Sequence, residues 1–189
     1  MHFALRFRNL SGYGASIGIK SITVLDDAYC DVDTTNYSLA NDSVEDIVAA
    51  TALTAGATSY NPVAQGIRFT TAIDADDFQT LVDLYDEGEV DMIEFGTLIT
   101  TEAWADAAGA VTFAALDTAV GESGKTAYVA VMATIGDFYD GLNTFAGSIG
   151  NAKAERTYVA VGFAKVTIGE EVLYVYSAAT TETLASVQG

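Results

Sequence analysis

Two arginines stand in apolar stretches that have the pattern of β-strands, in a chain with only 8 basic residues. Arg68 lies within Q-G-I-R-F-T-T-A-I (residues 65–73), and Arg156 opens R-T-Y-V-A-V-G-F. A guanidinium inside a sheet must meet carboxylates or carbonyls, because an unpaired buried charge is costly. We therefore predict that both arginines form structural charge pairs and that Arg68 is mostly buried against a carboxylate such as Glu94 or Asp137. The alternative is a clamp for a ligand's carboxylate or for sugar hydroxyls.

Sugar binding requires exposed aromatic rings beside polar side chains. The segment G-D-F-Y-D-G-L-N (residues 136–143) carries two aromatic residues between aspartates, with a glycine on either side. Aromatic residues in loops are often functional, although a loop that covers the core is the simpler interpretation. The candidate ligand-binding residues are Trp104, Asp137, Phe138, Tyr139, Asp140 and Asn143.

A calcium site is one interpretation of the early acidic segment, because Ca²⁺ prefers several hard oxygen ligands from one flexible loop. Its candidates are Asp26, Asp27, Asp31 and Asp33. The D-x-D-x-D-G spacing of an EF-hand is absent, so a solvated acidic loop is the preferred interpretation and no cofactor is predicted. One cysteine (Cys30) and one histidine (His2) leave no ligand set for zinc and no Ser-His-Asp or Cys-His site.

The charge balance excludes several partners. With 26 acidic and 8 basic residues the formal net charge is −18, and no cluster of Lys and Arg is available to contact phosphates. We therefore predict no nucleic-acid binding and no attachment to anionic membranes. No apolar run is long enough to cross a bilayer, so membrane insertion is not expected. No charged and then apolar leader follows Met1, and we expect no signal peptide in this chain.

Hydrophobic periodicity predicts an α+β fold with a mainly antiparallel sheet. Helical spacing of apolar residues indicates one amphipathic helix at about residues 76–86, capped by an aspartate and ended by Gly88. Short helices packed on the sheet are expected at 102–108 and 112–120, and G-E-S-G-K (121–125) is interpreted as a turn and not a phosphate loop. The predicted strands of this sheet system are residues 66–73, 92–100, 127–134, 145–149, 157–166 and 172–176.

The first part of the chain is predicted to differ in organisation from the rest. Residues 3–9 and 19–25 have strand patterns and suggest an N-terminal β-hairpin, followed by the acidic loop. We assign 1–47 to this hairpin and loop, as part of the same sheet or as a small preceding β-module, and 48–189 to the α+β module. Residues 43–46 resemble a helix capping box, whereas 54–62 are interpreted as a loop.

Five segments resemble, in their order, a module that recurs in large secreted and surface proteins of anaerobic Gram-positive bacteria. They are Q-G-I-R-F-T-T-A-I (65–73), F-G-T-L-I-T (95–100), F-A-G-S-I-G-N (145–151), R-T-Y-V-A-V-G-F (156–163) and Y-V-Y-S (174–177). The resemblance implies a secreted or cell-surface location, beside bacterial immunoglobulin-like repeats, cell-wall anchors or dockerins. It implies no defined activity and no catalytic residue.

We therefore expect a non-catalytic extracellular module of a bacterial surface or cellulosome-type protein, acting in adhesion or display. Polysaccharide binding is the sharper hypothesis within this class, and another surface protein is the other expected partner. A structural spacer or protein-docking domain is one alternative. A carboxylate-based enzyme acting on glycosides is another, although 26 acidic residues will always provide some suitable pair. A cleft with convergent acids would favour the enzyme, and an exposed aromatic strip would favour sugar binding.

Overall fold

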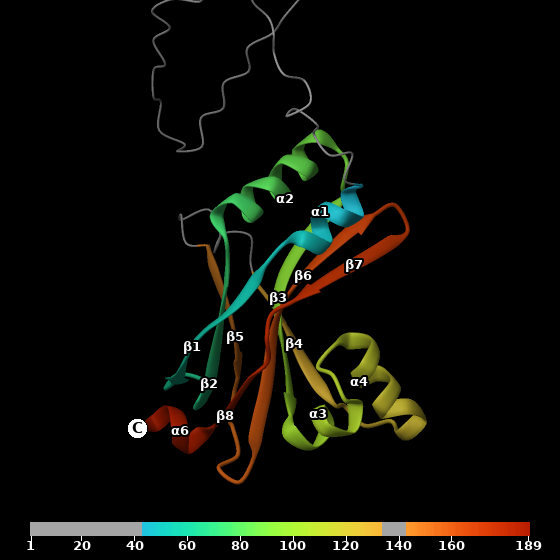
Figure 1. Ribbon diagram of the computed structural model, residues 1–189. Helices are drawn as coiled ribbons and strands as arrows, with labels where there is room; N and C mark the ends of the chain where they lie inside the picture. The colour runs from blue at the N-terminus through green and yellow to red at the C-terminus, as the bar shows by residue number, and fades with distance from the viewer. Residues whose placement is uncertain (1–42, 134–142) are drawn as a thin grey trace, which may run out of the picture. The chain divides into compact units, whose positions relative to one another are not determined.

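Two antiparallel sheets form the framework of the molecule in the computed structural model, which describes residues 43–133 and 143–189 (Figure 1). The three-stranded sheet has the order β1 (Leu53–Asn61), β2 (Gly66–Ile73), β5 (Thr144–Ile149). The five-stranded sheet has the order β4 (Tyr128–Met132), β3 (Met92–Thr101), β6 (Thr157–Ile168), β7 (Glu171–Tyr176), with β8 (Thr180–Thr183) also paired to β6. Every strand pairing between described residues is antiparallel. The α+β class is confirmed, but the strands divide between two sheets and do not form one.

Helices cover both ends of this framework (Figure 1). At one end lie α1 (Val44–Ala50) and α2 (Ala75–Glu87), whose Val48 and Leu81 are buried in a core cluster with Phe95 and Val166. On the other face of the five-stranded sheet lie α3 (Glu102–Ala108), α4 (Phe113–Val120) and the turn η1 (Gly121–Ser123). The chain ends in α6 (Leu184–Gln188).

The sequence signals for the main helix are confirmed. The Asp74 carboxylate accepts the backbone N–H of Asp76 at 2.9 Å, and Gly88 ends α2 with φ +80°, in the left-handed region that favours glycine. The capping box of α1 is also present, with Ser43 and Asp46 as its two partners. Because the caps fix both helices at one end of the strands, α2 packs over the start of β3, where Phe78 meets Phe95.

The two sheets pack closely because glycines face threonines where they cross. A Cβ on Gly147 of β5 would lie 2.5 Å from the Cβ of Thr97, and a Cβ on Gly162 of β6 would overlap Thr71 of β2. Both threonines are buried. Within the five-stranded sheet, the Phe163 ring occupies the space over Gly96. Close packing therefore explains Gly96, Gly147 and Gly162.

The structure corrects one expectation along the chain. Residues 54–62 were interpreted as a loop, but most of them belong to β1, an edge strand that carries a bulge between Ala55 and Thr58. The bulge and the small polar residues remove the apolar alternation on which strand prediction depends. The N-terminal hairpin at 3–25 lies outside the described residues, and so does most of the segment 1–47. No helix in the described part of the chain has the length and apolar content that a membrane crossing needs.

Candidate functional site

One half of a face of the five-stranded sheet is left uncovered by α3 and α4. Strand register places Glu94, Lys165 and Tyr174 in one row across β3, β6 and β7, and directly opposed residues project to the same face. The neighbouring row is Met92, Thr167 and Val172. These six residues are called the open face. Three of them expose large apolar surface: Met92 is 48%, Val172 42% and Tyr174 38% exposed.

The other half of the same face is covered. Leu98, Val161 and Phe163 form a buried cluster with Leu116 of α4. The Phe113 ring, at the start of α4, packs edge-on against Phe163 with ring centroids 5.1 Å apart. The covered half thus ends at the row of Phe163, next to the row that contains Tyr174.

Tyr174 stands at the boundary between the two halves, held by other aromatic rings. Its ring stacks on that of Tyr176 at 5.8 Å with an interplanar angle of 15°, and it lies 5.1 Å from the Phe113 ring. The Tyr176 hydroxyl oxygen accepts the Phe113 backbone N–H at 3.3 Å, and burial raises the pKa of Tyr176. Tyr174 is therefore a positioned ring with one accessible surface, and little rotamer entropy remains to be lost on binding.

The polar part of the open face is a single ion pair. The Lys165 ammonium donates to the Glu94 carboxylate at 2.6 Å, and the two side chains are 30% and 31% exposed. The hydrogen bond to Glu94 raises the pKa of Lys165. Because both groups remain partly in water, they have unused donor and acceptor positions for hydroxyl groups.

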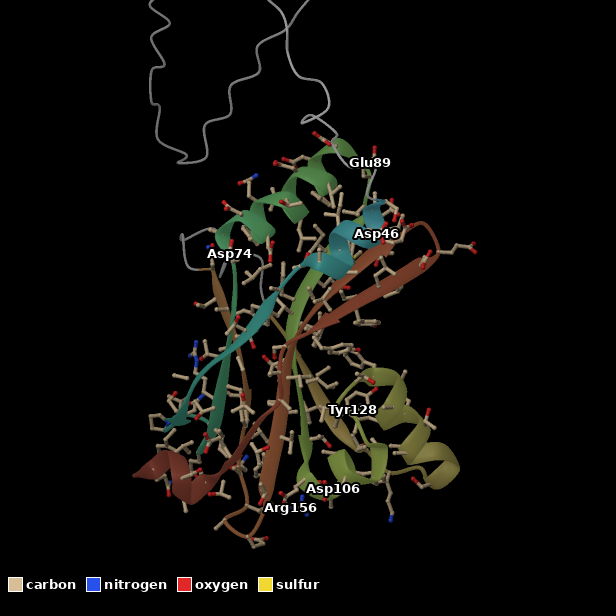
Figure 2. The ribbon with its side chains drawn as sticks, in the orientation of Figure 1. Asp46, Asp74, Glu89, Asp106, Tyr128 and Arg156 are labelled. Carbon is tan, nitrogen blue, oxygen red and sulfur yellow. The ribbon has the colours of Figure 1, made fainter. Side chains whose placement is uncertain are left out.

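A second tyrosine marks the far side of the helix pair. Tyr128 on β4 lies beside α4 (Figure 2), and its hydroxyl donates to Asp117 at 2.7 Å. Burial and then this hydrogen bond raise the pKa of Tyr128 to about 12. Tyr128 is thereby tied to α4 by a side-chain hydrogen bond as well as by packing against Phe113.

An apolar cavity of about 480 Å³ lies on the other side of β3, beneath α2. Its walls include Phe78, Val82 and Tyr85 of α2, together with Met132 and Ala133 at the end of β4. Tyr85 is 53% and Met132 44% exposed. The acidic residues at this cavity are Asp86, Asp91 and Glu94.

The predicted burial of Arg68 is wrong. Arg68 lies in β2 as expected, but it is exposed, because β2 turns alternate residues toward the five-stranded sheet and Arg68 toward the opposite side. Glu94, one of its suggested partners, is paired with Lys165. Arg156 is also exposed and precedes β6, in the turn at the far end of the sheet from α1 and α2 (Figure 2). Within the described residues neither arginine forms an ion pair.

The predicted sugar-binding residues are not brought together by the described structure. Trp104 is partly buried against the covered half of the sheet face. Asn143 is partly buried, and its backbone carbonyl accepts the N–H of Ile73 at 2.9 Å. Asp137, Phe138, Tyr139 and Asp140 lie outside the described residues, as do the calcium candidates Asp26, Asp27, Asp31 and Asp33. In residues 43–133 and 143–189 no three metal-ligating side chains gather in one place.

Sequence reasoning missed the open face. Its residues lie at alternate positions of predicted strands. This alternation tells which residues share a face of the sheet, but it does not tell which part of that face the helices leave open. The available signal was the pair Glu94 and Lys165, one charged residue in each of two otherwise apolar strands. No protein-family model, curated protein or solved structure matches the chain.

Proposed function

We propose that this chain is a non-catalytic, secreted or cell-surface module that binds polysaccharide through the open face. The observation that carries the proposal is the Tyr174 ring, exposed and fixed by stacking, in one row with the Lys165–Glu94 pair. A sugar ring presents an apolar C–H surface and a rim of hydroxyls, so it matches an aromatic platform beside partly solvated charged groups.

The dimensions of the open face support this function. Neighbouring strands lie about 4.8 Å apart, so Glu94 on β3 is roughly 10 Å from Tyr174 on β7, across Lys165. A pyranose stacked on Tyr174 therefore has Lys165 within reach of its hydroxyls, and Glu94 is placed for the next unit. Two sugar units would occupy the face, with Met92 and Val172 bordering it.

The sequence supports the location and the role. The five recurring segments give the expectation of a surface or secreted protein, and a net charge of −18 disfavours phosphate-rich or anionic membrane partners. Adhesion to a glycan, or display on one, needs a fixed binding surface and no reacting groups. The open face provides such a surface.

The test is affinity electrophoresis of the chain through gels that contain single plant or host polysaccharides, followed by Tyr174→Ala. At least one neutral polysaccharide should retard the wild type, and Tyr174→Ala should weaken that retardation by roughly tenfold, as expected for truncation of an aromatic anchor. The matched control is Tyr85→Ala, which removes another exposed tyrosine, on α2.

Two results would reject the proposal. One is that no polysaccharide in a broad panel retards the wild type. The other is that Tyr174→Ala and Tyr85→Ala reduce retardation equally, which would mean that a general loss of surface aromatics is responsible. Thermal unfolding of both variants shows that each still folds.

A further inference from the structure

The accessible side of the Tyr174 ring determines where a sugar can lie on the open face. Tyr176, two residues further along β7, stacks on one side of this ring with an interplanar angle of 15°. The other side of the ring therefore faces back along the strand toward Val172, which is 42% exposed. A pyranose stacked on Tyr174 thus lies above Val172. Lys165 and Thr167, the β6 partners of these two residues, border it.

The charge beside this position is already neutralised. Among the six residues of the open face, only Glu94 and Lys165 carry a charge. The Lys165 Nζ donates to the Glu94 Oε2 at 2.6 Å, so the pair as a whole has no net charge. Its remaining ammonium hydrogens can donate to hydroxyl oxygens, and its carboxylate can accept from hydroxyl groups. A neutral sugar offers both kinds of partner.

A sugar that carries a carboxylate would meet repulsion at the same position. A uronic acid differs from the neutral hexose by a carboxylate in place of the C6 hydroxymethyl group. Such a carboxylate would approach Lys165 only with the Glu94 carboxylate as a close neighbour, because the two side chains are in contact. The pair is only 30% and 31% exposed, so solvent screens this repulsion in part. Desolvation of the incoming carboxylate would gain no free cation in return.

We propose that Glu94 determines the specificity of the open face, which accepts neutral hexopyranose polymers and excludes polymers of uronic acids. Glu94 acts by occupying the one cation of the face and by repelling a second carboxylate. This inference rests on the proposed function, because it names the class of polysaccharide that the same site binds.

The probes are chosen as matched pairs that differ only in charge. They are soluble β-glucan, galactan and galactomannan, each beside the same polymer after oxidation of its C6 hydroxymethyl groups to carboxylates. Affinity electrophoresis of the full chain through gels that contain one probe gives an association constant for each. Any neutral probe that retards the wild type should bind roughly tenfold or more tightly than its oxidised form.

Glu94→Gln tests the residue itself. The substitution removes the negative charge, keeps the size of the side chain and leaves the Lys165 ammonium without an anionic partner. The oxidised probes should then bind roughly tenfold or more tightly than they bind to the wild type, and added salt should reduce this gain. Lys165→Met introduced together with Glu94→Gln should abolish the gain, because the free ammonium supplies it.

Asp106→Asn is the matched control. It changes the net charge of the chain by the same amount, but Asp106 is exposed on α3, which follows the opposite end of β3 (Figure 2). The strand separates Glu94 from α3 by roughly 20 Å, about twice the Debye length at 0.1 M salt. Asp106→Asn should therefore leave the preference for neutral probes within about twofold of the wild-type value. A melting temperature for each variant separates altered binding from lost folding.

The outcomes distinguish this inference from the proposed function. The inference alone is overturned if the wild type binds oxidised probes as tightly as neutral ones, or if Glu94→Gln and Asp106→Asn change the preference equally. Retardation of the wild type by oxidised probes only would assign the open face to acidic sugars, so it would overturn the inference and keep polysaccharide binding. If no probe of either kind retards the wild type or Glu94→Gln, both the proposed function and the inference are rejected.

Discussion

The two halves of one sheet face differ in what covers them, although they share the same three strands. In the half that includes Leu98, Val161 and Phe163, these residues are buried beneath α3 and α4. In the open half the corresponding positions are Glu94, Lys165 and Tyr174, which are 31%, 30% and 38% exposed. The transition from buried to exposed side chains occurs between two neighbouring rows, the row of Phe163 and the row of Lys165.

The connection after β3 explains the difference. α3 begins at Glu102, directly after β3 ends at Thr101, so the helix pair turns back over the end of the sheet from which it emerges. It reaches as far as Phe113, whose ring contacts both Phe163 and Tyr174. Beyond that ring the face carries a charged pair, which two short helices could not have buried without a desolvation cost. The buried cluster that stabilises the fold and the proposed binding face thus occupy adjacent rows of one surface.

The largest effect should come from the covered half. Leu116→Ala removes a side chain of α4 that is 0% exposed, so it should lower the free energy of unfolding by about 2–5 kcal/mol. Val172→Ala, an aliphatic truncation on the open half, should change it by less than about 0.5 kcal/mol. Urea denaturation of the two variants measures both values. Equal losses would show that the open half is covered in solution and would remove the basis for a binding face.

Much of the fold could be predicted because the periodic signals are strong. The alternation in β2 and β6, and the helical spacing between Asp74 and Gly88, each extend over enough residues to exclude other structures. β1 was missed because Gly56 and its small polar neighbours bury little, and the strand is held by pairing with β2. Pairing is a tertiary effect that local sequence does not express.

The site was predicted less well, for a physical reason that Arg68 illustrates. A charge in an apolar strand was taken to be buried because β2 was expected to lie inside one sheet system. In a two-sheet packing the outer face of β2 meets solvent, so the guanidinium needs no carboxylate partner there. The closely packed glycines also show the limit of sequence reasoning. A glycine inside a strand, such as Gly96, predicts that another group packs closely against it, but only the structure identifies that group as the Phe163 ring.

A smaller effect should come from Tyr128, which joins the covered half to α4. Tyr128→Phe removes the hydroxyl that donates to Asp117, and should cost about 1 kcal/mol near neutral pH. The pKa of this tyrosine is raised from 10.0 to about 12 in the folded chain, so the folded state keeps its proton after the unfolded state has lost it. The contribution is therefore complete below pH 10.0 and is lost as the pH rises toward 12.

Urea denaturation of wild type and Tyr128→Phe at pH 7, 10 and 11 tests this sign. The stability advantage of the wild type should narrow at the highest pH, while the other tyrosines affect both proteins equally. An advantage that stays constant across this pH range would mean that the pKa of Tyr128 is the same in the folded and unfolded states, as it is for an exposed tyrosine. The helix pair would then be looser than the covered half requires.

The smallest effect belongs to the ion pair of the open face. A double-mutant cycle with Glu94→Gln and Lys165→Met should give a coupling of about 0.5–1 kcal/mol, because both side chains remain partly hydrated and salt screens them. The pKa of Lys165 is raised by Glu94, so the coupling should persist at pH 9 and disappear only as the pH rises through the folded-state pKa. A coupling of several kcal/mol at pH 7, insensitive to salt, would instead indicate a dehydrated pair and a face already covered. Glu94→Gln can also be tested for polysaccharide retardation. A small coupling together with lost retardation would show that this ion pair contributes little to folding and much to binding, unlike the buried residues of the covered half.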